Sequence, residues 1–185
     1  MEKKNEWIYY LMLFFTFSFI GWIWEILWEF LKNGFIINSG VLYGPWLPIY
    51  GSGGIFIYMI LKKFNNNKLV VFLGSLVICS LIEYFTSLYL EVVYGLKWWN
   101  YSKRPFNLNG RICLLYSIAF GIGGYFCVHN VAPVVKKIFN KASKKVLKIA
   151  VIILIVFFSV DFVYATYKPH RVKRYKINEI LKANH

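Results

Sequence analysis

Five long apolar stretches constrain the fold of this 185-residue chain more than any other feature of its sequence. They are residues 8–31, 47–61, 69–90, 112–135 and 146–167. An α-helix needs about 20 apolar residues to cross the hydrocarbon core of a membrane, and four of the stretches reach that length. A mean hydropathy of +0.51 with only 16% charged residues excludes a soluble enzyme. We therefore predict an all-α, polytopic helical membrane protein of about five transmembrane helices.

The region between the first two stretches breaks the helical pattern. Residues 34–48 contain three glycines and two prolines, which a regular helix does not tolerate. Non-helical backbone at membrane depth requires protein or a water-filled cavity around it. We expect a broken or re-entrant segment that leads into a short or tilted second span. The remaining loops are too short for a soluble domain, so residues 1–185 are expected to form a single membrane domain with a basic tail over 168–185.

The charge distribution gives a weak indication of topology. The first apolar stretch is too long for a cleaved signal peptide and lacks a small-residue cleavage site, so we expect a retained anchor. The 22 lysines and arginines divide equally between the two sides of a five-span arrangement. If the loop that holds Arg111 is discounted because it resembles a site, the remaining charges favour an N-terminus on the inside under the positive-inside rule. The side of the C-terminal tail stays open.

Five of the eight acidic residues lie within the apolar stretches or at their ends: Glu25, Glu29, Glu83, Glu91 and Asp161. An ionisable group at the bilayer centre costs about 2.5–3.5 kcal/mol on insertion scales, so it must be paired, solvated or protonated. Glu25 and Glu83 lie deepest and are the stronger functional candidates. Glu29 and Glu91 lie near span ends, where an interfacial position explains them equally well. Asp161 favours an interfacial or helix-packing role over a role in a site.

The loop of residues 94–111 combines rings, amides and cations. Its aromatic side chains, typical of the belt at headgroup level, are Trp98, Trp99 and Tyr101. A belt does not explain Asn107, Asn109 and Arg111 at the mouth of a span. An arginine with amide neighbours suits a carboxylate or a phosphate. Arg111 is also the natural cation for one of the acids in the third stretch.

Other motifs point away from common enzyme classes. Residues 50–54 are rich in glycine but lack the Lys-Ser/Thr of a Walker A loop, so we predict no ATP site in this chain. Together with Gly121, Gly123 and Gly124, they indicate close helix packing through small residues. The three cysteines and three histidines form no ligand pattern, and we predict no metal and no cofactor. Whether the protein is an enzyme stays open, because no catalytic motif is recognisable.

Several motifs occur in one order over residues 19–124. The first half contains Gly21-Trp22 with Glu25, then Asn38-x-Gly40-x-x-Tyr43-Gly44-Pro45 and Pro48-Ile49-Tyr50-Gly51. The second half contains Glu83-Tyr84, Leu90-Glu91, Trp99-Asn100-Tyr101-Ser102 and the run from Pro105 to Cys113. In these motifs the chain resembles the CmpB-like family, whose usual description is "putative ABC-transporter type IV" or ABC transporter permease. The fifth stretch and the tail add nothing to the resemblance.

Two positions depart from the family pattern. An arginine often follows the asparagine where this chain has Ser39, and an aspartate usually stands at Asn100. The second departure puts in doubt any mechanism that needs an acid at that position. The resemblance implies a permease-like transport component, which would need a separate ATP-binding subunit. A chain of five spans is small for a permease half, so a homodimer is expected.

We expect an intramembrane polar site between the first, third and fourth spans. Its candidate residues are Glu25, Glu29, Asn38, Tyr43, Tyr50, Glu83, Glu91, Trp99, Tyr101, Asn107, Asn109 and Arg111. The alternatives are an intramembrane enzyme or binder that acts on a lipid headgroup, and a non-catalytic membrane accessory protein. Membrane lipids are expected partners. Nucleic acid is not, because the basic residues lie mainly between apolar runs. The expected location is a cell membrane, specifically a bacterial plasma membrane, crossed several times.

Overall fold

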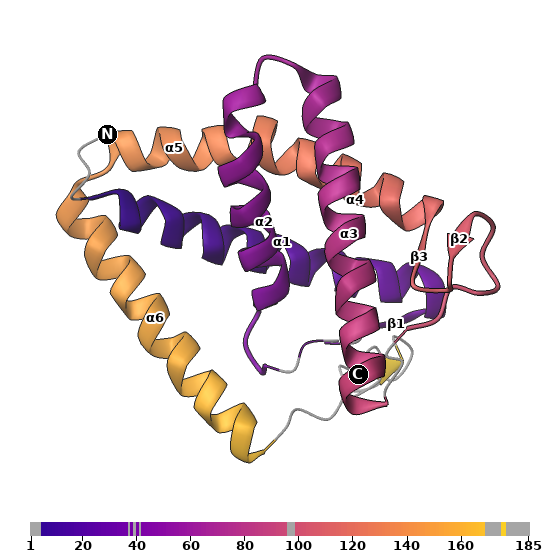
Figure 1. Cartoon of the computed structure of the whole chain (residues 1–185). Coiled ribbons are helices and arrows are strands. Elements are labelled where there is room, and N and C mark those ends of the chain that lie inside the picture. The colour runs from indigo at the N-terminus through magenta and orange to yellow at the C-terminus, as the bar shows by residue number, and fades with distance from the viewer. Residues whose placement is uncertain are drawn as a thin grey trace. The chain divides into compact units, whose positions relative to one another are not determined.

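The computed structural model describes residues 5–36, 38, 40, 42–95, 99–168 and 175–176. Its helices are α1 (Glu6–Asn33), α2 (Pro48–Leu61), the 3-10 turn η2 (Lys62–Phe64), α3 (Lys68–Tyr94), α4 (Leu114–Phe126), the π-helical turn η3 (Cys127–Val131), α5 (Ala132–Lys141) and α6 (Lys144–Tyr167). Two-residue strands pair antiparallel, β1 (Phe35–Ile36) with β4 (Tyr175–Lys176) and β2 (Asn107–Leu108) with β3 (Ile112–Cys113). Helices dominate the chain (Figure 1), so the predicted all-α class is confirmed.

Four helices in the described part of the chain are long and apolar enough to cross a membrane. They are α1, α3, α6 and the continuous helix Leu114–Lys141, which comprises α4, η3 and α5. The chain is thus a multi-pass membrane protein. The fifth helix, α2, has 14 residues and is about 21 Å long, short of a hydrocarbon core of about 30 Å. A fifth crossing therefore stays a prediction.

The helix that contains the predicted fourth span, residues 112–135, has other bounds than the apolar stretch itself. The first two residues of the stretch belong to β3, and the helix continues to Lys141. The continuation is amphipathic, because Val135 and Phe139 are buried four positions apart while lysines between and after them are exposed. The end of an apolar run therefore did not mark the end of the helix. Most of the predicted basic tail, 168–185, lies outside the described residues.

The chain divides into two compact units, Met1–Ile55 with Val135–His185 and Phe56–Val134. In the first unit, the beginning of α2 packs antiparallel to α1. Tyr50 lies against Gly21 of α1, Gly51 against Ser18 and Gly54 against Phe17, so α2 runs toward the N-terminus of α1. A single membrane domain over the whole chain remains a prediction.

The segment between α1 and α2 returns to the middle of α1. Gly34 ends α1 in the left-handed conformation, with φ of 68°, and its N–H donates to the carbonyl of Phe30 at 2.8 Å. The N–H of Leu47 then donates to the carbonyl of Ser18 at 3.0 Å. Because Ser18 lies near the middle of the 28-residue α1, α2 begins about half-way along it. The described residues of this segment are non-helical, which confirms the predicted break.

Helices α1 and α6 of the first unit begin close to each other. Tyr9 of α1 is 2% exposed, and its ring packs against Phe139 near the end of α5 with centroids 5.7 Å apart. Farther along, Phe14 and Phe15 both contact Phe158 of α6, at centroid distances of 5.7 and 6.0 Å. Both helices leave this shared end in the same general direction (Figure 1).

In the second unit, α3 and α4 form an antiparallel pair that packs through small residues. Ser80 donates a hydrogen bond to Ser117 at 2.7 Å, while Ser75 lies against Gly124. Serine and glycine let helix backbones approach closely, as predicted for Gly124. A buried apolar cluster in the same unit comprises Ile57, Leu61, Val71 and Val128.

Candidate functional site

The loop that precedes α4 folds into a compact hairpin around β2 and β3. Its turn uses left-handed backbone at Asn109 and Gly110, with φ of 54° and 66°. The side-chain amide of Asn107 donates to the carbonyl of Arg104 at 2.8 Å, and its oxygen accepts from the N–H of Gly110 at 3.0 Å. The N–H of Tyr101 donates to the Gly110 carbonyl at 2.8 Å. Asn107 thus holds the loop in shape, and the sequence did not indicate this hairpin.

Two further residues fix the start of the loop. The side-chain oxygen of Asn100 accepts from the backbone N–H of Ser102 at 3.0 Å and from its hydroxyl at 2.6 Å. An aspartate would accept the same two bonds, so the departure from the family pattern preserves this turn. The indole N–H of Trp99 donates to the carbonyl of Arg111 at 2.9 Å, which ties the two ends of the loop together. Trp98 lies outside the described residues.

Glu83 lies near the middle of α3 and meets this loop. The hydroxyl of Tyr101 donates to Oε1 of Glu83 at 3.0 Å. The other carboxylate oxygen, Oε2, is buried and has no hydrogen-bond partner among the described residues. The Tyr101 ring stacks on Tyr116 with centroids 4.8 Å apart. Burial and then the neighbouring Glu83 raise the pKa of Tyr101, so its hydroxyl remains a donor at neutral pH.

Arg111 pairs with Glu91 two turns farther along α3. Its Nη1 forms an ion pair with Oε2 of Glu91 and lies 3.4 Å from the hydroxyl of Ser87. The side chain of Arg111 is 12% exposed against 41% for Glu91. The hydrogen bond to Glu91 raises the pKa of Arg111, so its charge is held in place. The predicted pairing of Arg111 with an acid of the third stretch is confirmed, although its Nε is buried without a partner in the described part of the chain.

Tyr84 links Asn109 to Arg111. The amide of Asn109 donates to the Tyr84 hydroxyl at 2.9 Å, and the guanidinium carbon of Arg111 lies 5.8 Å from the centre of the Tyr84 ring. The loop is therefore fixed to α3 by contacts at three successive turns. The second unit brings together seven of the predicted residues: Glu83, Glu91, Trp99, Tyr101, Asn107, Asn109 and Arg111.

The first unit holds its own set of predicted residues. The hydroxyl of Tyr50, in the first turn of α2, donates to Oε1 of Glu25 at 2.5 Å. One turn on, Glu29 accepts from the amide of Asn33 at 2.7 Å in an exposed pair within α1. The carboxylate of Glu29 therefore binds a residue of its own helix, α1, whereas the carboxylate of Glu25 binds a residue of α2.

The side chain of Asn38 links the non-helical segment after α1 to that helix through hydrogen bonds. Its side-chain oxygen accepts from the indole N–H of Trp22 at 3.1 Å and from the N–H of Gly40 at 3.2 Å. Its amide donates to the carbonyl of Leu42 at 3.3 Å. These bonds account for both ends of the Asn38 amide group and link the segment to α1.

Asp161 of α6 binds the non-helical segment that precedes α2, which is a packing role of the kind expected for it. Its two carboxylate oxygens accept from the N–H groups of Tyr43 and Gly44 at 3.0 and 2.9 Å. They also accept from the indole N–H of Trp46 at 2.7 Å. The Tyr43 hydroxyl donates to the carbonyl of Lys168 at 3.0 Å. Asp161 thus binds residues 43–46 to α6. The sequence contains no signal for this pairing, because Asp161 is 115 to 118 positions away from its partners.

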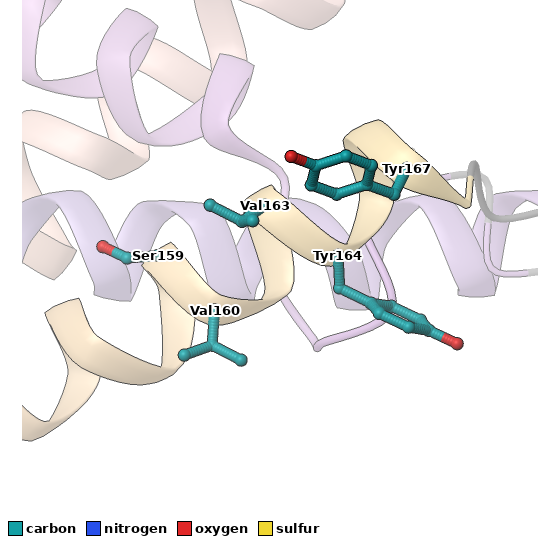
Figure 2. Close-up of a pocket in the computed structure, with 5 residues that line it drawn as sticks. All are labelled: Ser159, Val160, Val163, Tyr164 and Tyr167. Atoms are coloured by element: carbon teal, nitrogen blue, oxygen red, sulfur yellow. The ribbon is translucent and has the colours of Figure 1, made fainter.

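A shallow hollow of about 460 Å³ lies along α6. Figure 2 shows its lining residues on this one helix: Ser159, Val160, Val163, Tyr164 and Tyr167. It contains no charged residue and is largely open, which fits a surface that faces lipid. In the described part of the chain, no three His, Cys, Asp or Glu side chains gather in a way that could hold a metal ion.

A family model described as "Putative ABC-transporter type IV" matches residues 12–166, most of the chain. The chain belongs to this family. The match extends past the motifs of residues 19–124 and takes in α6 with Asp161, so our expectation that the fifth stretch adds nothing was wrong. Neither a curated protein nor a solved structure matches the chain.

Proposed function

We propose that this protein is the permease-like membrane component of a transport system, with Glu83 at the centre of its intramembrane polar site. The observation that carries this proposal is the incomplete bonding of the Glu83 carboxylate in a candidate span. One oxygen is held by Tyr101, while the other is buried and lacks a partner among the described residues. A carboxylate in that position must take up a proton, a cation or water. A proton or a small cation is therefore the species that the site would move or use for coupling.

The path of the chain after α1 supports the same proposal. The non-helical segment returns from the end of α1 to its middle, and α2 continues antiparallel to α1 from there. We infer that residues 34–61 cross the membrane in two parts, so that α2 needs to span only the remaining depth. Discontinuous helices of this kind are typical of transporters, where they border the substrate pathway. This gives five crossings.

The lipid-headgroup alternative has less support from the geometry. A headgroup phosphate would need the planar donors of Arg111, but this side chain is 12% exposed and already bound to Glu91. The family description favours transport and, because the chain has no ATP-binding motif, a separate ATP-binding subunit. A homodimer and a bacterial plasma membrane remain part of the proposal.

The site can be tested without knowing the substrate. The protein, together with any ATP-binding subunit that co-purifies in mild detergent, would be reconstituted with ATP in proteoliposomes, adsorbed on a solid-supported membrane and exposed to jumps in pH, Na⁺ or K⁺. We expect a transient current in the wild type that Glu83→Gln reduces at least about tenfold, because the amide cannot take up the charge. Glu29→Gln is the matched control and should leave the current unchanged, since Glu29 is half-buried and bonded to Asn33 of its own helix.

Two results would contradict the proposal. A wild type that gives no current for any ion would remove the charge-binding role of Glu83. A current that Glu83→Gln does not alter would do the same. If Glu83→Gln instead unfolds the protein while Tyr101→Phe does not, the carboxylate serves stability, and the accessory-protein alternative is favoured. Mass spectrometry of the complex isolated in mild detergent tests separately for an ATP-binding subunit.

A further inference from the structure

The turn between α5 and α6 carries the densest positive charge in the described part of the chain. We define the lysine hairpin as residues 135–148. Its lysines are Lys136, Lys137, Lys141, Lys144, Lys145 and Lys148, and the segment contains no aspartate or glutamate. The function proposed above uses none of these residues. Such a concentration of one sign of charge needs either a partner of the opposite sign or open water.

The lysines of the hairpin are available to a partner. All except Lys144 are exposed, and in the described part of the chain no carboxylate forms an ion pair with any of them. Lys144 has a different role. Its ammonium group donates to the carbonyl of Phe139 and lies 3.6 Å from the centre of the Phe139 ring. It therefore caps the C-terminus of α5 and holds the short turn in a fixed shape.

The position of the hairpin matches the headgroup layer of a membrane. It joins two candidate spans, Leu114–Lys141 and Lys144–Tyr167, with only two residues between them. The first of these helices is about 42 Å long, which exceeds a hydrocarbon core of about 30 Å. Some of its length must therefore lie at the level of the headgroups. A lysine at that level keeps its stem in the apolar region and its ammonium in the polar one.

Apolar side chains next to the lysines distinguish a lipid surface from a soluble partner. Val135 and Phe139 are buried, but Ile138 is 49% exposed and Val146 is 62% exposed. Exposed apolar groups flanked by exposed lysines are what an interfacial segment presents to acyl chains and anionic headgroups. An acidic protein or a nucleic acid would leave these apolar groups without a matching surface.

We propose that the lysine hairpin is a binding site for anionic phospholipid headgroups. It gathers a layer of acidic lipid around the shared end of α5, α6 and α1. The site is independent of Glu83, so a failure of the transport proposal would leave it standing.

Native mass spectrometry of the full chain, released from detergent with added phosphatidylglycerol or phosphatidylcholine, tests this proposal. We expect several bound phosphatidylglycerol molecules in the wild type and weaker binding of phosphatidylcholine. Replacing the five exposed lysines by glutamine should weaken phosphatidylglycerol binding at least about tenfold. The matched control replaces five basic residues in other loops by glutamine: Lys62, Lys63, Lys68, Lys103 and Arg104. It should bind phosphatidylglycerol as the wild type does.

Equal loss of binding in both variants would overturn the site, because net charge alone would then explain it. Unchanged binding in the lysine-hairpin variant would overturn it as well. A variant with arginine at the same five positions keeps the charge and should bind as the wild type does, which guards against a folding defect. In the unmodified protein, binding should fall as the ionic strength rises. Lipid binding that does not change with ionic strength would also contradict the proposal.

Discussion

Asp161 provides the most direct test of how the first unit is held together. Replacing it by alanine removes the acceptor of three hydrogen bonds, from the N–H groups of Tyr43 and Gly44 and from the indole of Trp46. Tyr43 is exposed, so water can replace its lost bond, but Gly44 and Trp46 are partly buried. A donor left unsatisfied away from water costs about 1–3 kcal/mol. We therefore expect Asp161→Ala to lower the free energy of unfolding by about 2–6 kcal/mol.

Thermal unfolding in one detergent would measure this effect. For a chain of this size, a loss of about 2 kcal/mol corresponds to a fall in Tm of at least about 4 °C. Asp161→Asn keeps one acceptor oxygen and should fall between the wild type and Asp161→Ala. Glu29→Gln is the control acid, since it keeps its bond to Asn33 on the surface, and should change the stability by no more than about 0.5 kcal/mol.

A double-mutant cycle identifies the bond itself. Trp46→Phe removes one donor and should cost less when Asp161 is already alanine, with a coupling energy of about 0.5–3 kcal/mol. Strictly additive effects of the two changes would contradict a direct interaction between Asp161 and Trp46. So would an Asp161→Ala variant that unfolds at the temperature of Glu29→Gln.

Two more predictions concern helix packing and topology. A Cβ at Gly51 would collide with Ser18 of α1, whereas nothing lies within 4 Å of a Cβ at Gly53, so Gly51→Ala should destabilise by about 1–3 kcal/mol and Gly53→Ala should be neutral or stabilising. Equal effects on Tm in the two variants would contradict the close crossing of α1 and α2. The five crossings proposed above, with the N-terminus inside, predict that a fluorescent reporter that folds only inside the cell works at the N-terminus and fails at the C-terminus. Alkaline phosphatase should be active only at the C-terminus, and both termini on one side would mean an even number of crossings.

The helices in the apolar stretches could be predicted from the sequence, because a membrane environment requires them. Each long apolar stretch became a helix, because backbone groups in lipid must be satisfied within the segment. The break between α1 and α2 followed from glycine and proline, and the close contact of Gly124 with Ser75 followed from small side chains. The end of α5 was missed, because its buried positions recur among lysines that interrupt the apolar run.

Long-range pairing was harder to predict. The pairing of Arg111 with an acid could be expected, but the choice of Glu91 depends on the hairpin of β2 and β3, whose two-residue strands have no alternating pattern. Asp161 and Trp46 are 115 positions apart, and neither residue type indicates the other. Such pairs are fixed by the fold, and a single sequence does not contain that information.

Asp161, Glu91 and Glu83 differ in how completely their carboxylates are bonded within the described part of the chain. Asp161 accepts three hydrogen bonds across both of its carboxylate oxygens. Glu91 has a charged partner in Arg111. Glu83 has one tyrosine hydroxyl and one buried oxygen without a partner in the described part of the chain. A carboxylate left incomplete costs stability in every resting molecule. In the transport proposal, the proton or cation that the protein moves would complete the bonding of this carboxylate and offset that cost.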